Sequence, residues 1–494
     1  PGGFPGWLRQ GDDPSECTVS DDHTFTITFK NPNGFFLWDL CQYERWLIVY
    51  FSHYMEQFHK DFVDADALEA MVKDAGFEDW TQLYGSRATF NDSSSEAPNW
   101  APWTMTQRVG AGEHVLWERN PYFWMVDTEG QQLPYIDKLD GKVHQAMDTM
   151  VLDAVAGEVD CQSRHLDNPA NIPVFQENME KGGFHLTEQV SPEGPTTVEF
   201  CLSMTTPDDV KRELFREKDF RLALSHAIDR EDMWGLVWRG AAEFDGPKWD
   251  SPLQQDEEDA IYKEAGQYDV ELANQMLDSL GLTERDSEGY RLMKDGRRTS
   301  ILIEGSITYP VKAQVLELVS QYWAEVGVEG IVKTWDRPLF QEKRANDECE
   351  LCSHGDPGRG ASWTVGLMVD ARMDAPVHWE ADYGHRWYTW YIDPNDPAGE
   401  EPPDDVKRAL ELYNQVKGTP DFEKQVELYK EIRMIRANGF WWIDLGPYWL
   451  EGVTFCVTKN DMANVPPRMP SNWPWLTPGP SQTWMYYFDP PRSA

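Results

Sequence analysis

The densest group of residues that could do chemistry lies in the C-terminal third of the chain. Residues 378–385 read His-Trp-Glu-Ala-Asp-Tyr-Gly-His and place four potential metal ligands within eight residues. His378 and His385 share a helical face only if the segment is helical, and Gly384 argues against a helix there. We therefore expect a polar loop near a cleft rather than a metal site.

A second candidate is the pair Cys349 and Cys352, which is followed by His354. The two thiols could form a local disulfide or contribute to a metal site. A zinc site needs four ligands, and no second Cys-x-x-Cys or His-x-x-x-His supplies the others. We predict no metal and no cofactor, and the disulfide state of the pair stays open.

Enzyme signatures are absent from the sequence. It contains no Gly-x-x-x-x-Gly-Lys-Ser/Thr loop for nucleotide phosphates, no Gly-x-Ser-x-Gly elbow and no His-Glu-x-x-His helix. A glycosidase needs only two well-placed carboxylates, and the 85 acidic residues cannot exclude such a pair. We predict that the chain is not an enzyme, with a carboxylate glycosidase as a remote alternative.

The charge balance excludes other classes of protein. Against 85 Asp and Glu stand 44 Lys and Arg, which gives a formal net charge of −41. A field of this sign repels phosphate backbones and anionic lipid heads, so a nucleic-acid partner is not expected. With 494 residues, the chain is long enough to divide into two or three domains.

Helical and strand patterns alternate along the chain. Apolar spacing and capping residues predict helices over 65–74, 219–227, 270–280, 312–324, 406–416 and 422–437. Asp64 and Asp269 are expected N-caps, and Gly157 suits a left-handed C-cap. Residues 24–29 alternate polar and apolar side chains, which predicts a strand whose Phe25, Ile27 and Phe29 face a core. This alternation of elements indicates an α/β fold.

Five segments, taken together and in order, resemble the extracellular solute-binding protein family 5, the peptide/nickel-type receptors of ABC importers. They are 118–137 (ERNPYFW, then LPYID), 156–160 (AGEVD), 220–230 (FRLALSHAIDR), 273–282 (ANQMLDSLGL) and 323–328 (WAEVGV). From the residues alone, these segments are scaffold rather than chemistry. The resemblance therefore indicates a class of receptor without naming its ligand.

The resemblance implies a two-lobed, periplasmic-binding-protein-like fold (type II, large cluster) with a hinge between the lobes. Mapped onto this chain, residues 1–90 would be a remnant of an N-terminal small domain, so the chain is expected to be N-terminally truncated. Lobe I would comprise 91–195 and 446–494, and lobe II would comprise 196–445. The two crossings would fall near 190–202 and 445–453.

The same resemblance implies a receptor that captures oligopeptides in the cleft and delivers them to the transmembrane permease subunits of an ABC importer. Large relatives also bind oligosaccharides, which the 23 tryptophans favour, so this alternative stays open. We expect a monomer that is periplasmic or extracellular. A lipid anchor is left open.

The predicted ligand-binding residues fall in two stretches. Arg164 and His165 follow a predicted strand and could face the cleft, and residues 354–391 have the aromatic and polar mix of a binding wall. Within that stretch, stacking on sugar faces or side chains is expected for the tryptophans Trp363, Trp387 and Trp390. The resemblance suggests that Asp356 meets the amino terminus of a peptide.

Overall fold

The computed structural model describes most of the chain. The described residues are 8–10, 13–42, 51–88, 97–108, 110, 112–144, 146–166, 171–190, 199–238, 252–253, 255–307, 310–353, 368, 371–445, 453–470 and 481–492. Within them, no helix has both the length and the apolar character needed to cross a bilayer.

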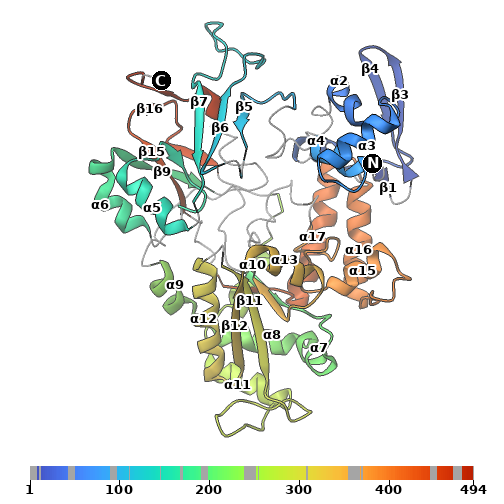
Figure 1. Ribbon diagram of the computed structural model, residues 1–494. Coiled ribbons are helices and arrows are strands. Elements are labelled where there is room, and N and C mark those ends of the chain that lie inside the picture. The colour runs from blue at the N-terminus through green and yellow to red at the C-terminus, as the bar shows by residue number, and fades with distance from the viewer. Residues whose placement is uncertain are drawn as a thin grey trace.

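A five-stranded sheet organises the body of the molecule that lies at the bottom of Figure 1. Its order is β12-β11-β13-β10-β14, with β11 parallel to β12 and β13, and β10 antiparallel to β13 and β14. The strands are β10 (Glu199–Leu202), β11 (Ser300–Ser306), β12 (Glu329–Trp335), β13 (Leu351–Ser353) and β14 (Ile443–Asp444). All of β10 is buried, as expected for a strand covered on both faces.

Helices from the middle of the chain pack on this sheet. They are α7 (Asp209–Arg216), α8 (Lys218–His226), α9 (Arg230–Trp238), α10 (Asp256–Ala265), α11 (Val270–Ser279), α12 (Pro310–Glu325) and α13 (Arg337–Ala345). The core between helices and sheet includes Phe200, Leu224 and Trp323, all fully buried. The indole of Trp323 donates to the carbonyl of Leu224, so this ring is buried with its polar atom satisfied.

Three later helices form a second hydrophobic cluster beside the first. They are α15 (His385–Ile392), α16 (Asp404–Lys417) and α17 (Phe422–Gly439). Arg436 of α17 is completely buried and pairs with Glu199 of β10 at 3.0 Å and with Asp374 at 2.9 Å. These paired charges join α17 to the five-stranded sheet.

A four-stranded sheet organises the body at the upper left of Figure 1. Its order is β17-β9-β15-β8, from the strands β8 (Cys161–Gln162), β9 (Phe184–Val190), β15 (Val453–Lys459) and β17 (Arg468–Pro470). The helices α5 (Met147–Ala156) and α6 (Ile172–Gly182) share a core with it. The strands β5 (Trp103–Gln107), β6 (His114–Arg119) and β7 (Lys138–Lys142) form an antiparallel sheet nearby, and β16 (Met462–Ala463) pairs with β18 (Tyr487–Phe488).

The chain passes between the two larger sheets twice. It leaves the four-stranded sheet at Val190 and enters the five-stranded sheet at Glu199. It leaves the five-stranded sheet at Asp444 and returns to the four-stranded sheet at Val453. These two connections fall at the predicted crossings near 190–202 and 445–453. Most of the connecting residues, 191–198 and 446–452, lie outside the described part of the chain. The exact domain boundaries stay a prediction.

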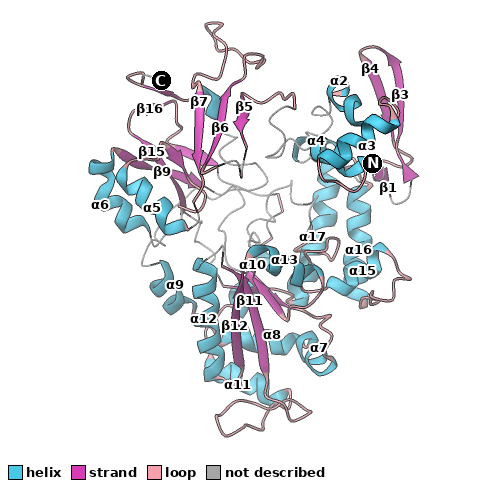
Figure 2. Cartoon of the chain, viewed as in Figure 1, coloured by secondary structure: helices cyan, strands magenta, loops and turns pink. Residues whose placement is uncertain are grey.

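The N-terminal elements lie against α16 and α17 (Figures 1 and 2). They are β1 (Arg9–Gln10), β2 (Asp13–Pro14), β3 (Glu16–Asp21), β4 (Thr24–Thr28), α1 (Phe36–Gln42), α2 (Ser52–Met55), α3 (Ala65–Asp74) and α4 (Trp80–Ala88). Gly34 donates its amide to the carbonyl of Lys417, and Gln425 donates back to the carbonyl of Gly34. A Cβ at Gly34 would lie 2.1 Å from the carbonyl oxygen of Thr419, so this close approach requires glycine.

One expectation for this region is wrong. The strand predicted over 24–29 forms β4, which pairs with β3. Phe25 is 56% exposed rather than packed in a core, and Ile27 and Phe29 are only half-buried. A two-stranded hairpin buries a face only if another layer covers it, and β3 is exposed along its whole length. The alternation of polar and apolar residues predicted the strand correctly. It does not indicate whether another sheet or helix packs on the apolar face.

The predicted capping residues are confirmed. Asp64 accepts from the amides of Asp66 and Ala67 at the start of α3, and Asp269 accepts from Leu272 at the start of α11. Gly157 follows α5 with φ 81°, a left-handed conformation that favours glycine.

Candidate functional site

The parallel part of the five-stranded sheet ends at one edge. β11 ends at Ser306 and β12 at Trp335, and the amide of Ile307 donates to the carbonyl of Trp335, which holds the two strand ends together. Helix α13 starts directly after β12, with Asp336 as its N-cap. Ligands of open α/β sheets bind beyond the carboxyl ends of parallel strands. This edge is therefore the side of the sheet where a ligand site is expected.

Arg164 and His165 lie just after β8 of the other sheet. The side chain of Gln162 donates to the carbonyl of Arg164 at 2.8 Å, His165 adopts φ 70°, and Leu166 is fully buried. The turn is thus fixed at both ends, with Arg164 exposed and His165 half-buried between them.

The pKa of His165, in this turn, is affected by a residue next to the five-stranded sheet. Burial, together with the positive charges of Arg164 and Arg337, lowers the pKa of His165, because each disfavours the imidazolium form. Arg337 is the first residue of α13, at the carboxyl edge of the five-stranded sheet. The charge of Arg337 therefore acts on the turn after β8, and Arg164 and Arg337 are two exposed cations in a strongly acidic protein.

A buried polar group lies behind the edge. The Trp335 indole donates to Oε1 of Glu304 at 2.8 Å, and Lys343 lies 3.3 Å from the same oxygen and 5.5 Å from the centre of the indole ring. Glu304 is fully buried near the end of β11. These contacts fix the orientation of Trp335 at the edge. No sequence motif pointed to this group, although an acidic residue directly after the apolar run 301–303 could have indicated it.

The segment 378–385 is a loop that leads into α15, as predicted. Its carboxylates are held by arginines, with Asp382 accepting from Arg344 at 2.7 Å and Glu380 pairing with Arg344 and Arg372. In the described parts of the chain, no three His, Cys, Asp or Glu side chains are arranged to hold a metal ion. The acidic residues here position the loop against α13.

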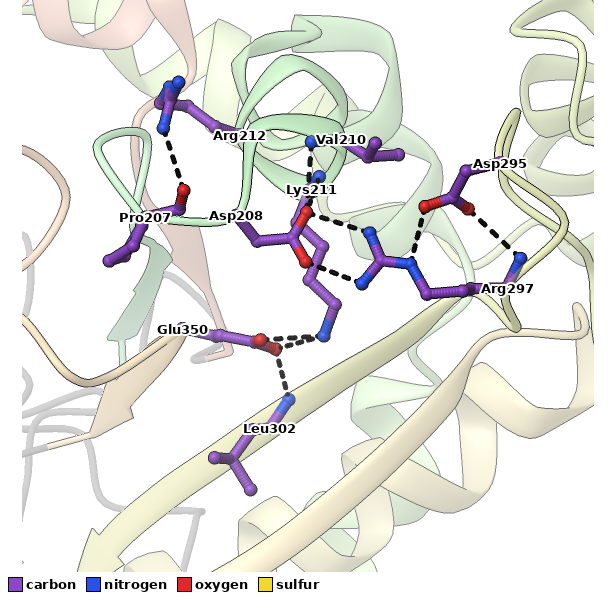
Figure 3. A network of polar contacts seen from close by, with 9 residues as sticks. All are labelled: Pro207, Asp208, Val210, Lys211, Arg212, Asp295, Arg297, Leu302 and Glu350. Atoms are coloured by element: carbon purple, nitrogen blue, oxygen red, sulfur yellow. Dashed lines mark hydrogen bonds and ion pairs between the residues drawn. The ribbon is translucent and has the colours of Figure 1, made fainter.

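Cys349 and Cys352 are buried free thiols. Burial raises the pKa of Cys352 well above its usual value, which keeps it protonated and unreactive. Between them, Glu350 accepts from Lys211 of α7 at 2.7 and 2.8 Å and from the amide of Leu302 at 2.9 Å, as Figure 3 shows. The motif therefore connects α7 to β11.

The same network fixes the start of α7. Asp208 accepts from the amides of Val210 and Lys211, and both of its carboxylate oxygens bind the guanidinium of Arg297 (Figure 3). Arg297 also donates to Asp295 at 2.5 Å. These contacts, with the Arg297 pair foremost, hold the pKa of Asp208 well below its ordinary value. The network is structural, because every charged group in it has a partner within the protein.

Trp387 lines a cavity of about 630 Å³ between α8, α15 and α16. Its ring is 1% exposed, and the guanidinium carbon of Arg216 lies 5.5 Å from the ring centre. The cavity also includes Met204, which follows β10 at the end of that strand opposite to Glu199. Trp390, in the same helix, is half-buried, and its backbone packs against Gly399. The structure thus places Trp387 and Trp390 on α15 and does not bring them together with Arg164 and His165.

Two predicted ligand residues, Asp356 and Trp363, lie outside the described residues. Their roles stay predictions, as do those of Arg164, His165, Trp387 and Trp390.

Comparison with known families decides the class of the protein. The model of the bacterial extracellular solute-binding proteins, family 5 (middle region), matches residues 1–362. The chain belongs to this family. Its membership confirms the resemblance drawn from the sequence motifs, and it is a family of extracellular solute-binding proteins rather than of enzymes.

Solved structures show the same fold. An oligopeptide-binding protein OppA is 27% identical, with a TM-score of 0.65 over 98% of this chain and 76% of that chain. The periplasmic binding protein MelB of Agrobacterium fabrum C58, solved with stachyose, is 16% identical, with a TM-score of 0.67 over 97% of this chain and 68% of that chain. The predicted α/β, periplasmic-binding-protein-like fold is confirmed.

A curated relative is similar over part of its length. The periplasmic alpha-galactoside-binding protein of Rhizobium meliloti (strain 1021) is 23% identical over 382 residues, which are 73% of this chain and 51% of that protein. A probable ABC transporter-binding protein of Deinococcus radiodurans is 24% identical over 46% of this chain and 38% of that protein. The chain thus spans about half or less of the length of these two relatives.

Proposed function

We propose that the chain is the solute-capturing part of an extracytoplasmic receptor of an ABC importer, and that its ligand is an oligopeptide. The observation that carries the proposal is the fold shared with an oligopeptide-binding protein at 27% identity over 98% of this chain. Two lobes, one built on each of the larger sheets, would close over the ligand, because only the closed form contacts it from both sides. Transmembrane permease subunits would then accept the loaded receptor.

The ligand would lie between the turn after β8 and the carboxyl edge of β11 and β12. Arg164 lies in the turn after β8, Arg337 begins α13, and both positive charges act on His165, which supports this placement. Two cationic side chains favour a ligand that carries a carboxylate, such as a peptide terminus or an acidic side chain. This supports peptides over neutral sugars.

An oligosaccharide is the second candidate. It is favoured by the relative named for alpha-galactoside binding and by the fold shared with a protein solved with stachyose. Aromatic rings stack on sugar faces, and the chain has 23 tryptophans.

A titration with two panels separates the candidates. Binding of mixed tri- to hexapeptides and of stachyose would be followed by calorimetry and by tryptophan fluorescence, with chromatography of the ligands afterwards. Saturable binding of peptides without turnover supports the proposal. Saturable binding of stachyose alone replaces it by the second candidate. Chemical conversion of any ligand would contradict a receptor function.

The proposed ligand contacts are tested with Arg164→Ala and Arg337→Ala. Each should weaken the binding of a peptide with a free C-terminus by about tenfold, equivalent to about 1.4 kcal/mol. Amidation of the peptide should remove most of that difference. The matched control is Arg408→Ala, because Arg408 lies on the exposed side of α16 and pairs with Glu431. Equal affinities of all three variants and the unmodified chain would contradict the placement of the ligand.

A further inference from the structure

Two cysteines that are distant in sequence meet in the four-stranded sheet. In the antiparallel pair of β8 and β15, Cys161 lies opposite Thr458, and Cys456 is two residues before Thr458 on the same strand. Side chains alternate between the faces of a strand, so Cys456 projects from the same face as Thr458 and therefore as Cys161. The two Sγ atoms lie 3.4 Å apart, although 295 residues separate them in the sequence.

The surroundings leave one of the two sulfurs accessible. Cys456 is 1% exposed and Cys161 is partly exposed. The hydroxyl of the buried Tyr486 contacts the sulfur of Met469, and burial followed by the charges of the two thiols raises the pKa of its phenol. An oxidant would therefore reach Cys161 first, with Cys456 positioned behind it as the resolving thiol. The hydrogen bond with Cys456 and burial raise the pKa of the Cys161 thiol, so it must lose its proton before it reacts and oxidation is expected to be slow near neutral pH.

We propose that Cys161 and Cys456 form a disulfide bond that connects β8 to β15. A disulfide needs a sulfur–sulfur distance of about 2.05 Å, so the two side chains must approach by about 1.4 Å. Disulfides persist in oxidising compartments, and the relevance of this bond in the cell rests on the extracytoplasmic location proposed above. Its formation in the test tube does not depend on that location.

The reaction needs a disulfide oxidant, for which oxidised glutathione is a suitable probe. The Cys161 thiolate attacks one sulfur of the oxidant, forms a mixed disulfide and releases one glutathione thiolate. The Cys456 thiolate then attacks Sγ of Cys161, closes the protein disulfide and releases the second glutathione thiolate. The two protons lost by the cysteines are taken up by the two glutathiones, so the protein is oxidised by two electrons and the oxidant is reduced by two.

The bond would also act on the proposed ligand site. Cys161 is followed three and four residues later by Arg164 and His165. A bond from Cys161 to β15 would hold the start of this turn against the sheet. We expect ligand affinity to be higher in the oxidised protein, because less of the turn must be ordered on binding.

The first test is a thiol map of the protein before and after oxidation. Reduced protein would be treated with oxidised glutathione, denatured, alkylated and digested. Of the seven cysteines, two should become protected, in a single linked peptide that contains Cys161 and Cys456. The melting temperature should rise by about 5 °C or more, since the bond closes a loop of several hundred residues. Alkylation of both cysteines after oxidation would overturn the proposal.

Variants distinguish this pair from the other thiols. Cys161→Ser, at a partly exposed position, should abolish the linked peptide and the rise in melting temperature, and Cys456→Ala should do the same. Cys17→Ser, at an exposed position, and Cys352→Ser should leave the linked peptide and the rise in melting temperature unchanged. A linked peptide that joins Cys349 to Cys352 in place of the predicted pair would refute the proposal.

Ligand titrations on the same oxidised and reduced samples keep the two proposals separate. A mapped disulfide without any ligand binding would contradict the receptor function and leave the disulfide established. If the protein binds ligand but Cys161 and Cys456 are both still alkylated after oxidation, the disulfide is refuted and the receptor function is supported.

Discussion

At the scale of single residues, Asp347 is a carboxyl group that its surroundings strongly perturb. It lies after α13 with φ 55°, and its Oδ2 is buried without a hydrogen-bond partner among the described residues. Burial raises the pKa of this carboxyl to about 7, and Arg386 offsets only part of the effect. The folded protein therefore holds a proton that the unfolded chain releases near pH 4.

This pKa gives a prediction about pH and stability. Between pH 4 and 7 the folded state binds more protons at Asp347 than the unfolded state, so the free energy of unfolding falls as the pH rises through this window. Asp347→Asn removes that dependence. It should stabilise the protein by about 1–3 kcal/mol at pH 8, discounted for partial exposure, and have little effect at pH 4.

Urea unfolding of the variant and the unmodified chain at pH 4 and pH 8 measures the difference. Asp22→Asn, at an exposed turn, is the control and should change neither value. A variant that is destabilised equally at both pH values would show that the pKa of Asp347 is the same in the folded and unfolded states, which would contradict the prediction.

At the scale of helices and strands, local signals predicted the element ends well. The caps at Asp64 and Asp269 depend on contacts within one helical turn, which the sequence contains in full. The exposure of Phe25 was not predicted, because it depends on which layer covers the hairpin.

Two glycines with similar positive φ values test how packing adds to backbone strain. Gly157 has φ 81°, and a Cβ there would lie 2.5 Å from the carbonyl oxygen of Gly182. Gly76 has φ 77°, and a Cβ there would meet no other atom within 4 Å. Alanine should cost about 1–2 kcal/mol at Gly76 from the left-handed backbone alone. At Gly157 the loss should reach about 2–4 kcal/mol, because the backbone of α6 must also shift.

Denaturant unfolding of Gly157→Ala and Gly76→Ala provides the comparison. Equal losses for the two variants would mean that the contact between α5 and α6 tolerates an added methyl group. That outcome would contradict the close approach described for this helix pair.

At the scale of the whole molecule, the net charge of −41 dominates the electrostatics. Self-repulsion destabilises the compact state, and salt screens it. Raising the ionic strength from about 0.01 to 0.15 M shortens the screening length from about 30 to 8 Å. The melting temperature should therefore rise over this range, although the same salt weakens surface ion pairs such as Lys30–Asp13.

Scanning calorimetry in potassium chloride, with sucrose of equal osmolarity as the control, measures this effect. A melting temperature that rises in potassium chloride but not in sucrose supports charge repulsion as the main electrostatic effect on stability. A fall in melting temperature would mean that the ion pairs outweigh the repulsion.

The sequence by itself determined the α/β class, most helix positions and the family, since these depend on periodicity, caps and ordered motifs that are written along the chain. Tertiary structure decided which distant residues meet: Cys161 with Cys456, Arg436 with Glu199, and Asp382 with Arg344. The physical reason is that such contacts depend on how whole sheets and helices pack. The burial of Trp387 in a cavity beside α16 belongs to the same category, because tryptophan is equally suited to a ligand site and to a core.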